Sequence, residues 1–310
     1  MKRIAILSAI LLVLPGMAFG EQFAKVGTFG GQFLKIGVSA RATGMGSAFT
    51  GVADDANSVF WNPGGLVNVV TNEVAINHVE WPADINLTSI AIATNPRSFP
   101  GTIALSARSL WLDPMLVRTA YEPDGTGQHF DAGSSTFGLS YARFWTDKFS
   151  AGFTLQYIHE GLAETAVNTF GFDFGMMYRI GVKDLKLGMV LQNLGGKMTF
   201  DETESKMPTT FKVGASFVPI VTDHHRMLFA AEFAHPSDNQ ERANVGVEYT
   251  LNRLFHVRTG YHINYDTDGV CFGFGAAINT GRQSKLQLDY SAVDMGPLQY
   301  VHRLSLGVVY

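Results

Sequence analysis

The chain has 310 residues, of which 46% are hydrophobic, 12% aromatic and only 16% charged. Soluble domains carry about 25% charged residues and disordered chains need high charge with few aromatics, so this composition excludes disorder and is unusual for a soluble enzyme. A single Cys excludes an intrachain disulfide or a cysteine-rich zinc site, and a net charge of −4 gives no basic footprint for nucleic acid.

Residues 1–20 have the layout of a secretory signal peptide. Two basic residues precede an apolar run over residues 4–13, and small residues occupy the −3 and −1 positions of a cleavage site after Gly20. The apolar run is too short to cross a bilayer as a helix, and no later stretch has the ~18 consecutive apolar residues that a membrane helix needs. A buried N-terminal helix is the alternative. The sequence predicts an exported protein with a cleaved signal peptide.

Residues 21–70 are dense in small side chains and lack sustained alternation of apolar and polar positions. Residues 53–60 are compatible with a short helix, and Pro63-Gly64-Gly65 predicts a turn. Asp54 and Asp55 are candidates for a pair of catalytic carboxylates. Adjacent side chains point apart on a helix, so we interpret them as helix-capping residues.

From Glu73 to the C-terminus, large apolar residues recur at every second position. Successive side chains of a strand point to opposite faces, so each such segment is predicted to be one strand. Fifteen candidate strands can be placed; residues 114–121 form the weakest, and closure of an antiparallel barrel requires an even number. The clearest runs are Phe170, Phe172, Phe174, Met176 and Tyr178, and Phe255, Val257, Thr259, Tyr261, Ile263 and Tyr265.

Strands of this pattern fit either a soluble β-sandwich or a transmembrane β-barrel. The apolar face is rich in aromatics toward strand ends, as girdles at membrane interfaces are: Trp145, Tyr157, Tyr178, Tyr249, Tyr265 and Tyr310. The opposite face carries charges of both signs, which suit a wet lumen: Asp173, Arg179, Lys212, Glu232, Glu248, Arg258, Asp289 and Arg303. Together with the signal peptide, these features favour a barrel.

The fold class predicted is all-β, a transmembrane antiparallel β-barrel of about 14 strands over residues 71–310. It must be closed, because an unpaired backbone group in hydrocarbon costs several kcal/mol. Residues 21–70 are then expected to form an N-terminal hatch in the lumen, since a barrel of this size otherwise encloses an aqueous channel. The alternative is a partly ordered periplasmic segment. The terminal Tyr310 resembles the signal that outer-membrane assembly machinery recognises.

Several motifs resemble the PorV/PorQ family, which is similar to FadL-type outer-membrane transporters. They are the run from Phe33 to Phe49, Val52-Ala53-Asp54-Asp55-Ala56, Trp61-Asn62-Pro63-Gly64-Gly65-Leu66, Arg118-Thr119 with Pro123-Asp124-Gly125-Thr126-Gly127, Leu139-Ser140-Tyr141-Ala142-Arg143, and Leu191-Gln192-Asn193-Leu194-Gly195 ahead of Pro208-Thr209. The resemblance spans most of the mature chain and implies a 14-stranded barrel with an N-terminal hatch. The hatch motif residues are Gly44, Gly46, Asp54, Asp55, Asn62 and Pro63. Gly64 departs from the family, which more often has Ala there.

Sites for chemistry are weak by comparison. The pair His224-His225 lies beside Asp223, but no further metal ligand follows at a suitable spacing. We therefore interpret the two histidines as polar residues of a turn and not as a metal site. Gly44-Met45-Gly46 and Gly273-Phe274-Gly275 lack the setting of a phosphate loop, and glycines in strands are expected to relieve crowding inside the barrel. Cys271 falls on the inward face. We predict no catalytic residue, no cofactor and no metal.

Two functions fit these expectations. As the PorV-like resemblance implies, the protein would be a non-enzymatic barrel of the cell outer membrane that assists protein secretion, with the loop from Leu110 to Ser135 contacting secreted cargo or a type IX translocon. As the FadL-like resemblance implies, it would be a passive transporter of a hydrophobic ligand, with movement of the hatch around Asn62-Pro63. The expected partners also include outer-membrane lipid and the barrel assembly machinery, and exclude nucleic acid.

Overall fold

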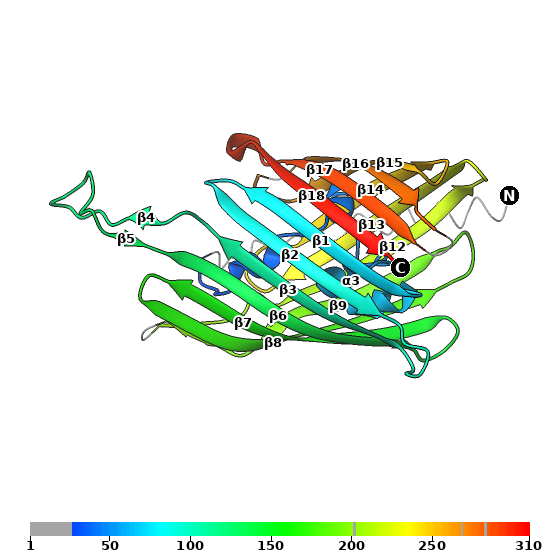
Figure 1. Ribbon diagram of the computed structural model, residues 1–310, viewed down its shortest axis with the longest axis horizontal. Helices are drawn as coiled ribbons and strands as arrows, with labels where there is room; N and C mark the ends of the chain where they lie inside the picture. Colours follow the sequence, from blue (N-terminus) through cyan, green and yellow to red (C-terminus); the bar gives the residue numbers. More distant parts are fainter. Residues whose placement is uncertain (1–26, 201–202, 268, 282–283) are drawn as a thin grey trace.

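The protein is a closed antiparallel β-barrel of fourteen strands, seen in a computed structural model that describes residues 27–200, 203–267, 269–281 and 284–310 (Figure 1). The predicted signal peptide, residues 1–20, lies outside the described residues. Strand β1 pairs with β2 on one side and with β18 on the other, which closes the barrel. The predicted barrel is confirmed and the alternative of a soluble sandwich is wrong.

The barrel strands follow one another in space in chain order, and two short hairpins stand outside the ring. The barrel consists of β1 (Asn72–Trp81), β2 (Ile85–Thr94), β3 (Thr102–Trp111), β6 (Ala132–Phe144), β7 (Phe149–Leu162), β8 (Thr165–Arg179), β9 (Lys186–Gly195), β12 (Thr210–Val221), β13 (His225–Pro236), β14 (Arg242–Leu251), β15 (Phe255–Ile263), β16 (Val270–Asn279), β17 (Lys285–Asp294) and β18 (Tyr300–Val309). The hairpins pair β4 (Met115–Leu116) with β5 (His129–Phe130), and β10 (Met198–Phe200) with β11 (Thr203–Ser205).

Alternation along the strands decides which side chains face outward. On β8, Phe170, Phe172 and Phe174 are 56%, 50% and 48% exposed, whereas the intervening Asp173 is only 1% exposed. The apolar face therefore forms the outside of the barrel and the small or polar face lines the lumen. This arrangement places hydrocarbon against aromatic and aliphatic side chains while every ladder hydrogen bond is made within the ring.

Two features of the predicted strands need correction. The weakest of the fifteen candidates, residues 114–121, is not a barrel strand, because only Met115 and Leu116 pair, and they do so within the β4–β5 hairpin. Tyr265 does not share the outward face of β15. The strand ends at Ile263, Asn264 adopts a positive φ of 64°, and this change of backbone direction turns Tyr265 onto His262.

The two ends of the barrel differ. At one end, called here the terminal end, Tyr310 hydrogen-bonds to Asn72 and the connections between strands are short. At the other, called the loop end, lie the longest connections, residues 112–131 and 196–209, each carrying a hairpin. Outer-membrane barrels have short periplasmic turns and longer extracellular loops, and the two ends of this barrel differ in the same way.

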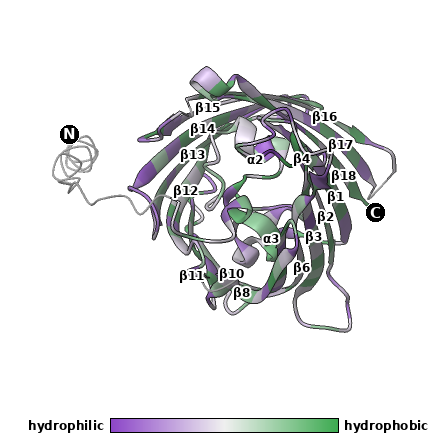
Figure 2. Ribbon diagram, turned by 90° about the vertical axis from the view of Figure 1, so that its left-hand side faces the viewer, coloured by the Kyte–Doolittle hydropathy of each residue, from purple (hydrophilic) through white to green (hydrophobic). Residues whose placement is uncertain are grey.

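Residues 27–70, called here the lumenal segment, lie inside the ring of strands (Figure 2). The segment contains η1 (Gln32–Lys35), α2 (Ala40–Gly44), α3 (Ser58–Trp61) and η2 (Pro63–Asn68), and its other residues form turns and extended stretches. Outside the segment, a further short helix, η3 (Gly296–Leu298), precedes β18. Among the described residues, no helix has both the length and the hydrophobicity to cross a membrane.

Candidate functional site

Three pairs of glycines on the barrel wall bring it against the backbone of the lumenal segment. The members of each pair face one another across neighbouring strands: Gly152 and Gly175, Gly188 and Gly214, and Gly246 and Gly260. A Cβ added at any of these six positions would stand less than 3.0 Å from an atom of the segment. Only glycine permits this approach of two backbones. The glycine pairs therefore form three smooth contact areas around the lumen.

Each contact area receives one motif of the segment. Met45 and Gly46 lie on the pair Gly246 and Gly260, whereas Thr50 and Gly51 lie on the pair Gly188 and Gly214. Gly46 itself has a positive φ of 62°, a conformation that glycine adopts without strain. Gly44, two residues earlier, packs on the backbone of Gly273.

The Asn-Pro-Gly motif occupies the third contact area. The Asn62 side chain donates hydrogen bonds to the carbonyl oxygen of Thr50 at 2.8 Å and to that of Met176, on β8, at 3.2 Å. Its Oδ1 accepts a hydrogen bond from the backbone N–H of Gly64 at 3.0 Å and so caps η2, with Pro63 in the first turn. Asn62 is fully buried. One side chain thus joins the segment to itself and to the wall.

An ionic cluster fixes the centre of the segment to the wall. The Arg41 guanidinium, on α2, contacts Asp54 Oδ1 at 2.5 Å and Asp55 Oδ2 at 3.3 Å, and its Nε donates to Glu248 Oε2, on β14, at 3.1 Å. Glu248 also accepts from Arg258 Nε at 2.7 Å. We call these residues, with Asp289, the Arg41 cluster.

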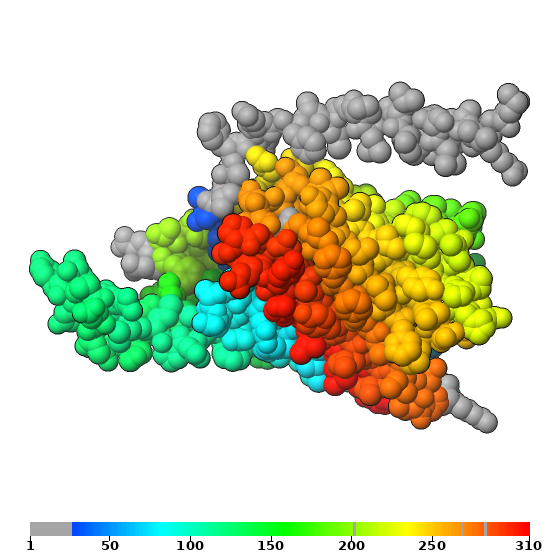
Figure 3. Space-filling view, turned by 90° about the horizontal axis from the view of Figure 1, so that it is seen from above, coloured from blue at the N-terminus to red at the C-terminus, as the bar shows by residue number. Residues whose placement is uncertain are grey.

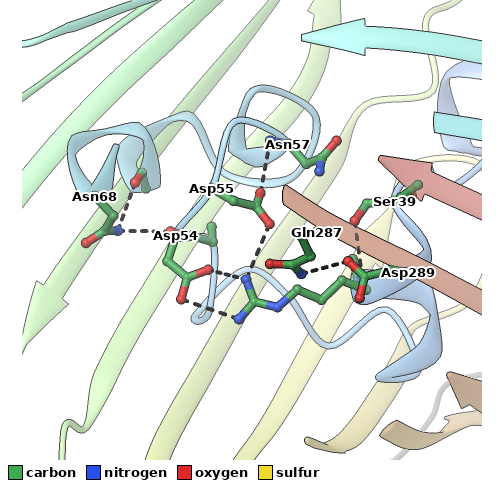
Figure 4. Close-up of polar contacts among 12 residues, drawn as sticks. Ser39, Asp54, Asp55, Asn57, Asn68, Gln287 and Asp289 are labelled. Atoms are coloured by element: carbon green, nitrogen blue, oxygen red, sulfur yellow. Dashed lines mark hydrogen bonds and ion pairs between the residues drawn. The ribbon is translucent and has the colours of Figure 1, made fainter. Parts of the chain in front are cut away.

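The Arg41 cluster continues along the wall to β17. Arg258 Nη1 donates to Asp289 Oδ1 at 2.6 Å, and Gln287 donates to the other oxygen of Asp289 at 2.7 Å. Figure 4 shows Asp54 and Asp55 of the segment converging with Gln287 and Asp289 of β17 on one region of the lumen. Two arginines and four carboxylates, from the segment and from three strands, therefore form one hydrogen-bonded chain.

Burial and charge act differently on the two aspartates of the segment. Burial and the neighbouring Asp54 carboxylate raise the pKa of Asp55 to about 6, against the attraction of Arg41. Burial also acts to raise the pKa of Asp54, but Arg41 and Lys186 outweigh it and lower that pKa below its ordinary value. Arg41 therefore favours the ionised form of both aspartates, and burial opposes it.

The predicted lumenal charges are all found in contacts at the lumen. Five touch the segment directly: Glu232 accepts from Thr50 N, Glu248 from Arg41, Arg303 Nε donates to Gly37 O, Arg179 donates to Asn68, and Lys212 lies 5.3 Å from the centre of the Trp61 ring. Arg258 and Asp289 belong to the Arg41 cluster. Asp173 instead accepts hydrogen bonds within the wall, from Gln156 and from Asn193 N.

The interpretation of Asp54 and Asp55 as capping residues holds for Asp55 but omits the contact that the two aspartates share. Asp55 does cap a turn, since its Oδ1 accepts from Asn57 N at 2.9 Å, but both carboxylates also converge on Arg41. They do so because residues 53–57 are not helical, and α3 begins only at Ser58. The sequence analysis did not identify Arg41 as the cation that Asp54, Asp55 and Glu248 share. The signal was available, because residues 27–70 contain only four charged residues, among them one arginine and this aspartate pair.

Two cavities lie on opposite faces of the segment. The loop-end cavity, of about 470 Å³, is lined by segment residues such as Phe33 and Trp61 and by loop residues up to Thr267. The terminal-end cavity, of about 440 Å³, is lined by Arg41, Asp54, Asp55 and residues of the wall near Lys285. Different residues of the segment line each cavity, so the segment lies between them.

The remaining residues considered for metal binding or reactivity, His224, His225 and Cys271, lie in a turn and on strands of the barrel wall. His224 lies in the turn between β12 and β13, and His225 begins β13 beside Tyr249. Cys271 is buried on β16, facing His262 at the lumen. Within the part of the chain that the structure describes, no three His, Cys, Asp or Glu residues are grouped as metal ligands would be.

Comparison with known proteins gives one family and a set of similar folds. Residues 20–236 match the family described as type IX secretion system protein PorV. The fold is similar to that of the monoaromatic hydrocarbon channel CymD, with a TM-score of 0.57 and 10% sequence identity over 88% of this chain and 97% of that one. It is also similar to the toluene transporter TbuX of Ralstonia pickettii, with a TM-score of 0.57 and 12% identity over 87% of this chain and 96% of that one. The toluene transporter TodX of Pseudomonas putida gives a TM-score of 0.57 and 10% identity over 86% of this chain and 96% of that one. No curated protein matches the chain by sequence.

Proposed function

Because the chain belongs to the family of the type IX secretion system protein PorV, we propose that it is a non-enzymatic outer-membrane protein that assists secretion or surface delivery of other proteins. Residues 1–20 would direct its export and be cleaved. Secreted cargo, or the translocon that exports it, would be its partner at the cell surface.

The observation that carries this proposal is the fixed position of the lumenal segment. Three backbone-to-backbone contact areas and the Arg41 cluster join the segment to strands all around the ring. Interiors packed at such distances transmit strain and do not deform continuously. A barrel with its lumen occupied in this way is suited to act through its surface, where loops and strands meet a partner, rather than as an open conduit.

The β4–β5 hairpin is the surface best placed for such a contact. It projects beyond the loop end of the barrel, as the blue-green part of the chain in Figure 3 shows. Its ladder continues past the strands through Val117 N to Gln128 O at 2.8 Å, and its Tyr121 is 96% exposed. An exposed tyrosine on a projecting loop is available as an aromatic anchor for a protein partner.

We expect Tyr121→Ser to lower capture of the partner about tenfold, because aromatic anchors dominate binding energy at interfaces. The measurement is affinity capture by the tagged full-length protein from native envelopes. If the protein assists delivery, the captured proteins should be secreted proteins that share a C-terminal domain. Tyr300→Ser is the matched control: this tyrosine is also exposed and begins β18 at the same end. Equal capture by both variants would remove the hairpin from the proposal.

The alternative is a FadL-like passive transporter of hydrophobic small molecules. The apolar part of the loop-end cavity, including Phe33, Leu34 and Trp61, favours it. If the protein assists delivery and is not a transporter, we expect that the intact protein in liposomes passes no labelled hydrophobic solute. In planar bilayers it should give no steady current. Deletion of residues 33–65 should open the lumen to both. Passage of the hydrophobic solute through the intact barrel, blocked by solute competitors, would instead establish transport.

A further inference from the structure

Two cations of the loop-end cavity have no oxygen partner within the described part of the chain. Neither Lys212 nor Arg242 makes a hydrogen bond or an ion pair with another described residue. Of their nitrogen atoms only Arg242 Nε is fully buried, so Lys212 Nζ and the two terminal nitrogens of Arg242 are open to the cavity. Other cationic side chains at the lumen each contact an oxygen atom: Lys35, Arg41, Arg108, Arg179, Arg258 and Arg303. Lys212 and Arg242 are therefore available to a ligand.

The two cations stand in one row of the barrel wall. Lys212 on β12 is in register with Ala234 on β13, and Ala234 is in register with Arg242 on β14. Neighbouring strands lie about 4.8 Å apart, so the Cα atoms of Lys212 and Arg242 are about 10 Å apart. Ala234, between them, also lines the cavity. Because two long side chains flank a short one, there is room between the two charges for one anion.

An aromatic ring holds each of the two cations in place. Lys212 Nζ lies 5.3 Å from the centre of the Trp61 ring, and Arg242 Cζ lies 4.4 Å from the centre of the Tyr265 ring. Both rings are themselves fixed, since the Trp61 indole N–H is hydrogen-bonded within the lumenal segment and Tyr265 stacks on His262 at 4.6 Å. A cation over the face of a ring keeps its N–H donors for a ligand. The two charges are therefore positioned by packing and not by a carboxylate.

The charge and the size of the cavity favour a phosphate monoester. Lys35 is paired with Asp238 at 2.7 Å, and the other charged side chains that line the cavity leave an excess of two positive charges: Arg108, Lys212, Arg242 and Arg303 against Glu232 and Asp266. A phosphate monoester carries about −1.5 to −2 charges near neutral pH and three acceptor oxygens, whereas a carboxylate carries one charge on two oxygens. The volume of about 470 Å³ is that of a small-molecule site and far exceeds a bare phosphate.

We propose that the loop-end cavity binds a phosphate monoester, with the phosphate between Lys212 and Arg242. Arg242 would donate two parallel hydrogen bonds to the phosphate, and Lys212 would act as a point charge. Aromatic side chains of the cavity, among them Phe33 and Trp81, would contact the esterified group. The phosphate can belong to a lipid headgroup or to a soluble sugar phosphate. This site goes beyond the function proposed above and does not depend on it.

The test is isothermal titration of the purified full-length barrel, in an uncharged detergent, with three probes that share one sugar ring: glucose 1-phosphate, glucuronate and glucose. We expect glucose 1-phosphate to bind about tenfold more tightly than glucuronate, since one further hydrogen bond to a charged group contributes about that factor, and glucose not to bind. Dihexanoyl phosphatidate, with dihexanoylglycerol as its neutral control, distinguishes the sources. Binding tenfold tighter than that of glucose 1-phosphate indicates a lipid headgroup, and equal or weaker binding indicates a soluble ester.

Three variants locate the site. Lys212→Gln and Arg242→Gln should each lower the affinity for glucose 1-phosphate about tenfold. Ala234→Asp should abolish its binding, because the new carboxylate would occupy the place of the phosphate between the two cations. Lys285→Gln, in the terminal-end cavity, is the control and should change nothing.

Two results with the wild-type protein would overturn the proposal even if a variant failed to fold. The first is equal affinity for glucose 1-phosphate and glucuronate, and the second is the absence of binding by both phosphate esters. Titration with small molecules is also independent of partner capture through Tyr121, so this proposal and the proposed function can each fail alone.

Discussion

Substituting alanine for Gly246 is expected to destabilise the barrel by about 3 kcal/mol, the upper end of the usual effect of overpacking a rigid interior. The added Cβ would stand less than 3.0 Å from the carbonyl oxygen of Met45. Neither partner can give way, because Gly246 belongs to a paired strand and Met45 to a segment held at several other points. The effect is measured as the free energy of unfolding by urea in detergent, and as protease access to residues 33–65.

The matched control is Gly307→Ala. Gly307 is also a strand glycine, on β18, but its added Cβ would meet its nearest atom, Gln287 Cβ, at an ordinary 3.7 Å. We expect a change below about 1 kcal/mol. The double variant Gly188→Ala and Gly246→Ala should be destabilised by about the sum of the single effects, because the two glycines lie in different contact areas. If Gly246→Ala behaves like Gly307→Ala, the segment is not held by the glycine pairs and the lumen is free to open.

The barrel could be predicted from sequence because period-two alternation is a local signal. In a run such as Phe170, Phe172 and Phe174, the alternation alone shows which side chains share the apolar face of the strand. Closure of the barrel follows because every backbone polar group in lipid must be hydrogen-bonded. The weak candidate at residues 114–121 instead contributes only the short strand β4, in a hairpin outside the ring.

The interior could be predicted only in part. The inward charges were recognised by their place on the polar face, but the partner of each depends on which strands meet the segment across the lumen. Gly188 and Gly214 illustrate the limit: each is an unremarkable strand glycine in sequence, and the pair exists only through the β9–β12 register. The role of Arg41 could not be recognised from sequence for the same reason, because its partner Glu248 lies 207 residues away along the chain.

Removing the Arg41 side chain is expected to have the largest effect of any single change in the segment. In Arg41→Ala, Asp54 and Asp55 lose their shared cation, and Glu248 retains only its partners on the wall. Breaking a buried ion pair from one side costs about 3–5 kcal/mol, because the other charge remains buried. We expect a fall of that size in the free energy of unfolding and release of the segment to protease. Arg41→Lys should recover little, since an ammonium cannot bridge three carboxylates in a fixed fork.

Two further variants separate charge burial from loss of packing. Asp54→Asn and Asp55→Asn added to Arg41→Ala should restore at least half of the lost stability, because no uncompensated aspartate is then buried. Arg226→Ala is the matched control: this arginine approaches the same Glu248 at 3.6 Å but is 32% exposed, so its loss should cost below about 1 kcal/mol. If the triple variant is no more stable than Arg41→Ala, the cluster holds the segment through the packing of the Arg41 side chain, and its charges are incidental to the closed lumen.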